Sequence, residues 1–216
     1  HELLDDFPIG EDVKVMGMRR NGALVLTVAM PFLATEIPNR AAYAEARDDA
    51  QVAIQAFAED LDRRDVTVVV NTADDLESDK VYLTLTGTSA EMGDDGAVGR
   101  GNRVNGVIAP FRSTSLEAAC GKNPISHVGK VYNVLALSAA QEIVDTVADV
   151  KEATVYILSQ IGAPLDAPLM ATALVRSVNG ALTPEVSGDV ERVLDARLAG
   201  VHDVREDILA REMCLF

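Results

Sequence analysis

Residues 43–61 read YAEARDDAQVAIQAFAEDL, and the stretch 66–71 that follows closely reads VTVVVN. In the first stretch apolar residues recur every three or four positions, which places one apolar stripe on a helix whose other faces carry Asp, Glu and Arg. The second stretch is a β-branched run with the length of a buried strand. A long amphipathic helix that leads at once into a strand predicts a mixed α+β fold.

Elements of the same two kinds lie on both sides of this stretch. In each half of the chain a long helix leads to a strand, a turn and another strand. We therefore expect an α+β fold of repeated β-α-β-β modules, with amphipathic helices packed on mixed sheets, and we place the modules at residues 1–120 and 121–216. The predicted strands are 23–30, 66–71, 81–87, 154–159 and 169–178, and the predicted helices are 38–64, 126–147, 188–198 and 203–213.

The charge balance limits the partners of this protein. Acidic side chains number 34 against 19 basic ones, a formal net charge of −15. Such a charge repels phosphate backbones, so we expect no nucleic-acid partner. No apolar run approaches the roughly 20 residues that span a bilayer, and Cys120 and Cys214 are too few for a disulfide scaffold. We therefore expect a soluble cytoplasmic protein with no membrane partner.

The chain's unusual residues gather in one region. Residues 87–106 read GTSAEMGDDGAVGRGNRVNG, and 121–130 read GKNPISHVGK. Glycines let backbone amides approach a ligand closely, while guanidinium and ammonium groups bind phosphate oxygens. This combination suits a polyphosphate with Mg²⁺ held by carboxylates, although turns with solvated cations remain the alternative. The cations of the region are Arg100, Arg103, Arg112, Lys122 and Lys130.

Two long segments carry a family resemblance. Residues 93–106 (GDDGAVGRGNRVNG) and 119–133 (ACGKNPISHVGKVYN) closely resemble the archaeal-type S-adenosylmethionine synthetases, also called methionine adenosyltransferases. Further matches are 10–17 (GEDVKVMG), 71–75 (NTADD) and 157–162 (ILSQIG). The resemblance extends over nearly the whole chain.

The resemblance implies a reaction. The sulfur of L-methionine attacks C5′ of ATP and expels the triphosphate, which is split to phosphate and pyrophosphate before release. It also implies Mg²⁺, K⁺ as a second candidate cofactor, and a homodimer with active sites between subunits. Chains of this family are about twice as long and carry a His-Pro-Asp segment that is absent from this sequence. We therefore expect the carboxy-terminal half of such an enzyme, inactive alone.

The resemblance also assigns roles to residues. It implies that Arg100 and Lys122 are catalytic phosphate contacts and that Asp94 touches the substrate. Gly129 stands where the more distant branch of the family has a magnesium-binding Asp, so the metal ligand is unknown, with Asp94 or Asp95 as candidates. The expected ATP-binding residues are Asp94, Asp95, Arg103, Lys122, His127 and Lys130.

Several alternatives stay open. His127 lies beside the expected helix start, where Ser126 is a plausible cap, so it either binds an anion or packs at the helix end. Asp74 and Asp75 follow a strand and are more typical of acceptors in a turn than of a site. A protein that lost the amino-terminal chemistry would be a non-catalytic nucleotide- or polyphosphate-binding scaffold with the same fold. A phosphohydrolase acting on triphosphate alone is a weaker reading.

Overall fold

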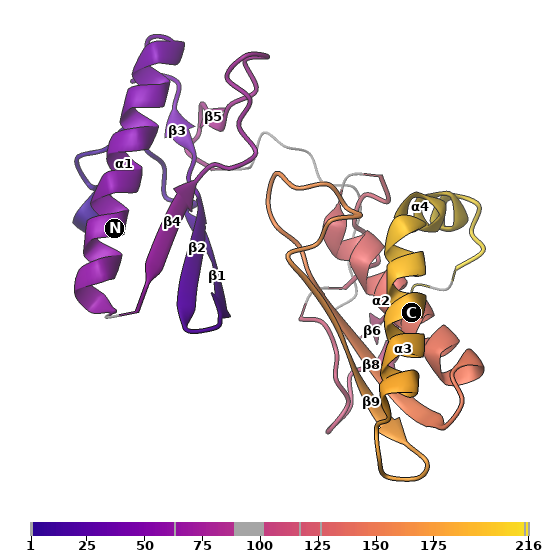
Figure 1. The fold of residues 1–216 in the computed structure, drawn as a ribbon. Coiled ribbons are helices and arrows are strands. Elements are labelled where there is room, and N and C mark those ends of the chain that lie inside the picture. Colours follow the sequence, from indigo (N-terminus) through magenta and orange to yellow (C-terminus); the bar gives the residue numbers. More distant parts are fainter. Residues whose placement is uncertain are drawn as a thin grey trace. The chain divides into compact units, whose positions relative to one another are not determined.

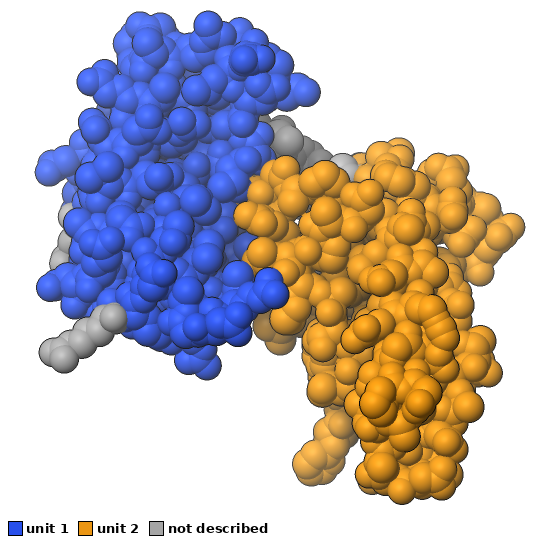
Figure 2. Space-filling model, viewed as in Figure 1, with its two compact units in different colours: residues 1–93 blue, residues 94–216 orange. Residues whose placement is uncertain are grey.

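The computed structural model describes residues 2–62, 64–88, 102–116, 118–125, 127–213 and 215. The chain forms two compact units, residues 1–93 and 94–216, each of which is described by itself (Figures 1 and 2). The sequence pattern predicts a division after residue 120. Residues 102–116 contribute to the second unit because Val104 packs in one of its cores and Ser113 contacts Tyr156.

The first unit is built on a three-stranded sheet. Its strands are β1 (Lys14–Arg20), β2 (Ala23–Ala29) and β4 (Val66–Val70), in the order β1-β2-β4. β1 and β2 form an antiparallel hairpin through Asn21 and Gly22, whose φ angles of 51° and 88° are both positive, as the tightest hairpin turns require. β2 and β4 are parallel, with a helical crossover between them. The sequence pattern predicts β2 and β4 but not β1.

The crossover is α1 (Arg40–Leu61), which lies along β2 and β4 (Figure 1). Asn39 caps it, since its Oδ1 accepts a hydrogen bond of 3.0 Å from the amide of Ala42. Tyr43 and Ala50 of the predicted apolar stripe are buried in one core cluster with alternate residues of β2 and β4. The first part of the stripe therefore covers one face of the sheet, as its spacing predicted. Phe57 and Leu61, expected on the same stripe, are instead exposed near the end of the helix.

The strand expected at 81–87 is much shorter in the structure. Among the described residues, β5 (Leu83–Thr84) pairs only with β3 (Phe32–Leu33), in parallel. The amide of Tyr82 donates to Asp74 Oδ1 at 3.1 Å and to the Tyr43 hydroxyl at 3.2 Å, so side chains take the place of a partner strand there. A short 3₁₀ helix, η1 (Glu2–Leu4), precedes the sheet.

The second unit combines helices with two antiparallel hairpins. The small hairpin pairs β6 (Asn102–Arg103) with β7 (Gly106–Val107), and the large one pairs β8 (Val150–Leu158) with β9 (Met170–Ser177). The helices are α2 (Val128–Thr146), α3 (Pro184–Ala199) and α4 (Val201–Leu209).

Two cores hold the second unit together. Ile143 of α2, Val155 of β8 and Leu194 of α3 belong to one cluster, and Figure 1 shows α3 alongside the large hairpin. Leu135 of α2 and Val204 of α4 belong to the other. The predicted helices 126–147, 188–198 and 203–213 correspond to α2, α3 and α4, and the predicted strands 154–159 and 169–178 correspond to β8 and β9. β8 begins four residues earlier than expected, and α4 ends four residues earlier. The α+β class holds for both units. None of the described helices is long and apolar enough to cross a membrane.

α3 begins earlier than expected. The sequence pattern predicts a start at about residue 188, whereas the helix begins at Pro184. Thr183 Oγ1 accepts a hydrogen bond of 3.3 Å from the amide of Val186, and proline is well suited to the first helical position because its missing N–H has no partner there. The early start thus follows from a cap followed by proline.

Candidate functional site

The predicted site residues divide into two groups. Asp94, Asp95 and Arg100 lie outside the described residues. Arg103, Lys122, His127 and Lys130 are described, and all four belong to the second unit. Three of these four gather around the start of α2.

His127 is the N-cap of α2. Its Nδ1 accepts a hydrogen bond of 3.1 Å from the amide of Gly129, so a side chain satisfies one of the free amides at the helix start. With Nδ1 as acceptor, a neutral His127 carries its proton on Nε2, where it can donate to a ligand. Ser126, the cap expected from the sequence, lies outside the described residues, and the capping role falls to His127.

Lys122 reaches the same helix turn. A Cβ atom placed on Gly129 would lie 3.0 Å from the His127 ring and 3.6 Å from Cε of Lys122. The glycine therefore leaves room for a ring and a lysine stem against the first turn of α2. The loop before it turns at Gly121, whose φ is +81°, and the amide of Lys122 donates to the carbonyl of Ala119 at 3.3 Å.

Lys130 is a buried cation. Its relative exposure is 6%, and among the described residues no carboxylate lies within ion-pair distance of its ammonium group. Burial lowers the pKa of Lys130; the positive charge of Lys122 lowers it further, against an opposing effect of Cys120. Buried charges in proteins normally have a partner of opposite sign. The positive charges of Lys122 and Lys130 therefore lie near the positive end of the α2 dipole.

Arg103 has a structural task. The residue is 8% exposed, and its guanidinium donates from Nε to the carbonyl of Ser115 at 2.7 Å and from Nη2 to that of Leu116 at 2.9 Å. Its neighbour Val104 packs in the same core as the first half of α2. Arg103 thus ties residues 115–116 to the small hairpin that lies against α2, an arrangement that the sequence did not reveal.

The Asp pair of the first unit serves the fold, as expected. Asp75 accepts hydrogen bonds from Ser78 Oγ at 2.6 Å and from the amide of Glu77 at 3.0 Å. Asp74 accepts one of 2.7 Å from the Tyr43 hydroxyl. Burial raises the pKa of Tyr43, and the hydrogen bond to Asp74 raises it further. The sequence pattern predicts Tyr43 as part of the apolar stripe and does not indicate this polar contact.

Within the described part of the chain no three His, Cys, Asp or Glu side chains gather as metal ligands. The metal candidates from the sequence, Asp94 and Asp95, lie outside that part.

Comparisons with known proteins agree on one family. The family model of S-adenosylmethionine synthetase (AdoMet synthetase) matches residues 4–212. The S-adenosylmethionine synthases of Pyrococcus horikoshii and Haloarcula marismortui are 47% and 43% identical to this chain over 208 residues, 96% of this chain and 52% of each relative. That of Methanothermobacter thermautotrophicus is 46% identical over 210 residues, with the same coverage of both chains. The chain thus spans about half the length of these curated relatives.

Proposed function

The chain belongs to the S-adenosylmethionine synthetase family, and from this premise we propose that it takes part in forming S-adenosylmethionine from ATP and L-methionine, with release of phosphate and pyrophosphate. The observation that carries the proposal is the buried Lys130, which has no carboxylate partner among the described residues of a chain with a net charge of −15. A polyanionic substrate supplies the charge that this lysine lacks.

The start of α2 would act on the triphosphate. Lys122 and Lys130 would bind its oxygens as cations, while His127 would donate from Nε2 as it caps the helix. When the sulfur of methionine attacks C5′, negative charge grows on the departing triphosphate, and cations already in place stabilise that charge. Loss of one such group would cost on the order of 3 kcal/mol of transition-state stabilisation, by analogy with the removal of one oxyanion donor.

The remaining assignments follow the resemblance. Arg100 would be a further catalytic phosphate contact, Arg103 a further ATP-binding residue, and Asp94 a substrate contact. Asp94 and Asp95 offer the carboxylate oxygens that Mg²⁺ prefers, and the metal, when bound, would neutralise phosphate charge. K⁺ is the second cofactor that we propose.

The wider setting is also part of the proposal. We assign the chain to a homodimer in the cytoplasm. We also regard the two units as copies of one β-α-β-β module, since α1 and α2 each lead into a strand and cover one face of its sheet.

Calorimetry with inorganic tripolyphosphate tests the anion site without requiring turnover. The chain should bind tripolyphosphate, and Lys122→Ala should weaken binding at least tenfold. The matched control is Lys151→Ala, at an exposed lysine on β8, which should change affinity less than twofold. Equal affinities for all three proteins would contradict the assignment of Lys122.

Mass spectrometry of mixtures of the chain with ATP, methionine, Mg²⁺ and K⁺ tests the reaction itself. We expect no S-adenosylmethionine from the chain alone and product from a synthase of the relatives' full length. Product from the chain alone would contradict the expectation that it is inactive by itself.

A further inference from the structure

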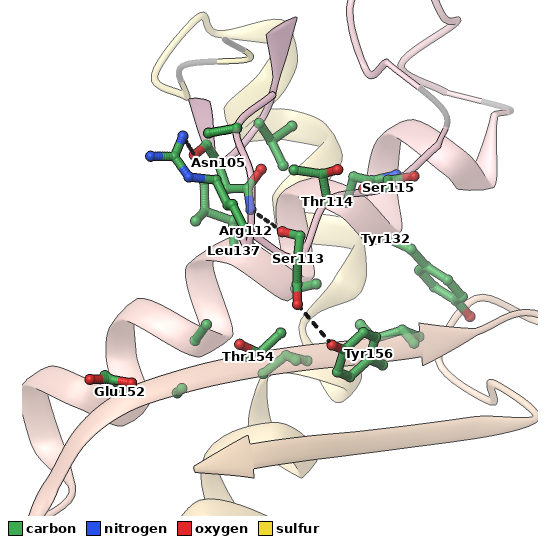
Figure 3. A pocket seen from close by; sticks show the side chains of 18 of the residues that line it. Asn105, Arg112, Ser113, Thr114, Ser115, Tyr132, Leu137, Glu152, Thr154 and Tyr156 are labelled. Carbon is green, nitrogen blue, oxygen red and sulfur yellow. Dashed lines mark hydrogen bonds between the residues drawn. The ribbon is translucent and has the colours of Figure 1, made fainter. Parts of the chain in front are cut away.

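The second unit contains a groove that the anion site does not use. Its volume is about 910 Å³ (Figure 3). One wall is the segment 109–115, the floor is the face of α2 from Tyr132 to Val144, and the other wall is β8 from Glu152 to Ile157. The volume lies within the range of sites that bind a substantial ligand.

One side of β8 faces this groove without a partner strand. β9 pairs with β8 along its length, from Val150 opposite Ser177 to Leu158 opposite Met170. Among the described residues no strand pairs with the other side of β8, and Figure 3 shows Ser113 on that side, opposite β9. An edge strand with unpaired amides and carbonyls is a template for another strand.

The segment 109–115 does not pair with the free edge of β8, because the Ser113 carbonyl and the Arg112 guanidinium are hydrogen-bonded to the β6–β7 hairpin. The carbonyl of Ser113 accepts from Asn105 Nδ2 at 2.7 Å, and Arg112 Nη1 donates to the carbonyl of Val107 at 2.9 Å. Both bonds hold the segment to the β6–β7 hairpin. Across the groove, the hydroxyls of Ser113 and Tyr156 lie 3.1 Å apart (Figure 3).

The chemistry of the groove fits a neutral extended segment. Its floor includes small apolar side chains such as Ala136, Ala140 and Val144. The charges at its walls are already satisfied: Glu152 pairs with Arg176 at 2.9 Å, and Arg112 is bound to a carbonyl. The six residues of β8 that line it would run about 20 Å, long enough to pair with a strand of ordinary length.

We propose that this groove receives an extended strand from the half of an S-adenosylmethionine synthase that this chain does not match, and that the strand extends the β8–β9 sheet at the edge of β8. The match covers 52% of the relatives, so they contain nearly as much polypeptide again that could supply it. Main-chain hydrogen bonds would hold the strand, and its apolar side chains would cover the floor on α2. The inference rests on the proposed function of this chain as part of a longer synthase.

Photo-crosslinking in the full-length Pyrococcus horikoshii synthase tests the proposal. A benzoylphenylalanine is placed at the position aligned with Tyr156, which lines the groove, and in a control protein at the position aligned with Leu174, an exposed residue of β9 outside it. The Tyr156 position should crosslink to a peptide of the same polypeptide from the unmatched half, whereas the Leu174 position should not. A crosslink to the segment aligned with 109–115 without one to the unmatched half, a crosslink to a second copy, or no crosslink would overturn the proposal. A crosslink to that segment in addition to one to the unmatched half is expected, because the hydroxyls of Ser113 and Tyr156 lie 3.1 Å apart.

Hydrogen exchange gives a readout that needs no substitution. Amides of β8 should exchange at least tenfold more slowly in the full-length synthase than in this chain alone, because the added strand protects those on the groove side. Equal rates would overturn the inference. Tripolyphosphate binding is measured separately. If tripolyphosphate binds but no strand occupies the groove, only the strand proposal is refuted. If a strand occupies the groove but tripolyphosphate does not bind, only the anion site at the start of α2 is refuted.

Discussion

Replacement of Lys130 by methionine should change stability and anion binding in opposite directions. Lys130 is 6% exposed, and among the described residues no carboxylate pairs with it. Methionine keeps most of the length and apolar volume of the stem but removes the buried charge. From the behaviour of buried charges replaced by apolar groups, we expect a gain of about 1 kcal/mol in the free energy of unfolding. The chain should lose on the order of 3 kcal/mol of tripolyphosphate binding, about a hundredfold in affinity.

Urea unfolding and calorimetry measure the two effects on the same protein samples. The control is Lys151→Met, which removes an exposed lysine and should alter the free energy of unfolding by less than 0.5 kcal/mol, as surface substitutions usually do. A Lys130→Met protein that is less stable and binds tripolyphosphate as the parent does would refute the reasoning, because the lysine would then serve the fold and not a ligand.

Three further predictions concern single groups. His127→Ala should lower the free energy of unfolding by about 1 kcal/mol in urea, and His127→Asn should restore most of it, because asparagine is also a good N-cap. Asn71→Ala should cost about 2 kcal/mol by the same assay, since Asn71 bonds both the amide and the carbonyl of Met30 at 2.9 Å and its loss leaves buried groups unpaired. Bound tripolyphosphate should raise the lowered pKa of Lys130, because its negative charge favours the protonated amine. Calorimetry in two buffers of different ionisation enthalpy should therefore show proton uptake on binding, and Lys130→Met should reduce it. The affinity for tripolyphosphate should fall as pH rises through the pKa of Lys130 in the bound state.

The helices could be predicted because each must bury an apolar stripe. The helical spacing of apolar residues in 43–61 and in 128–147 indicates which side chains face the core. The ends of both helices lie within three residues of those expected. β1 was missed because its sequence, KVMGMRR, has little apolar character and most of its residues are exposed. It is a strand because it pairs with β2 through an Asn-Gly turn, and that turn is the signal that could have revealed it.

In the candidate site too, contacts between residues close in the sequence could be predicted, whereas contacts between distant residues could not. Lys122, His127 and Lys130 lie within nine residues of one another in the sequence, so one loop and one helix turn bring them together. The task of Arg103 depends on residues 115–116 folding back onto the small hairpin, which no local pattern indicates. The groove beside β8 likewise depends on contacts between distant segments.

A titration of the ¹⁵N-labelled chain with tripolyphosphate, followed by NMR, tests the central claim most directly. The account predicts that the largest shifts fall on the amides of Gly129 and Lys130 at the start of α2, and that they disappear in Lys122→Ala. Shifts confined to other parts of the chain, or no shifts at millimolar tripolyphosphate, would contradict the assignment of this helix start as the phosphate site.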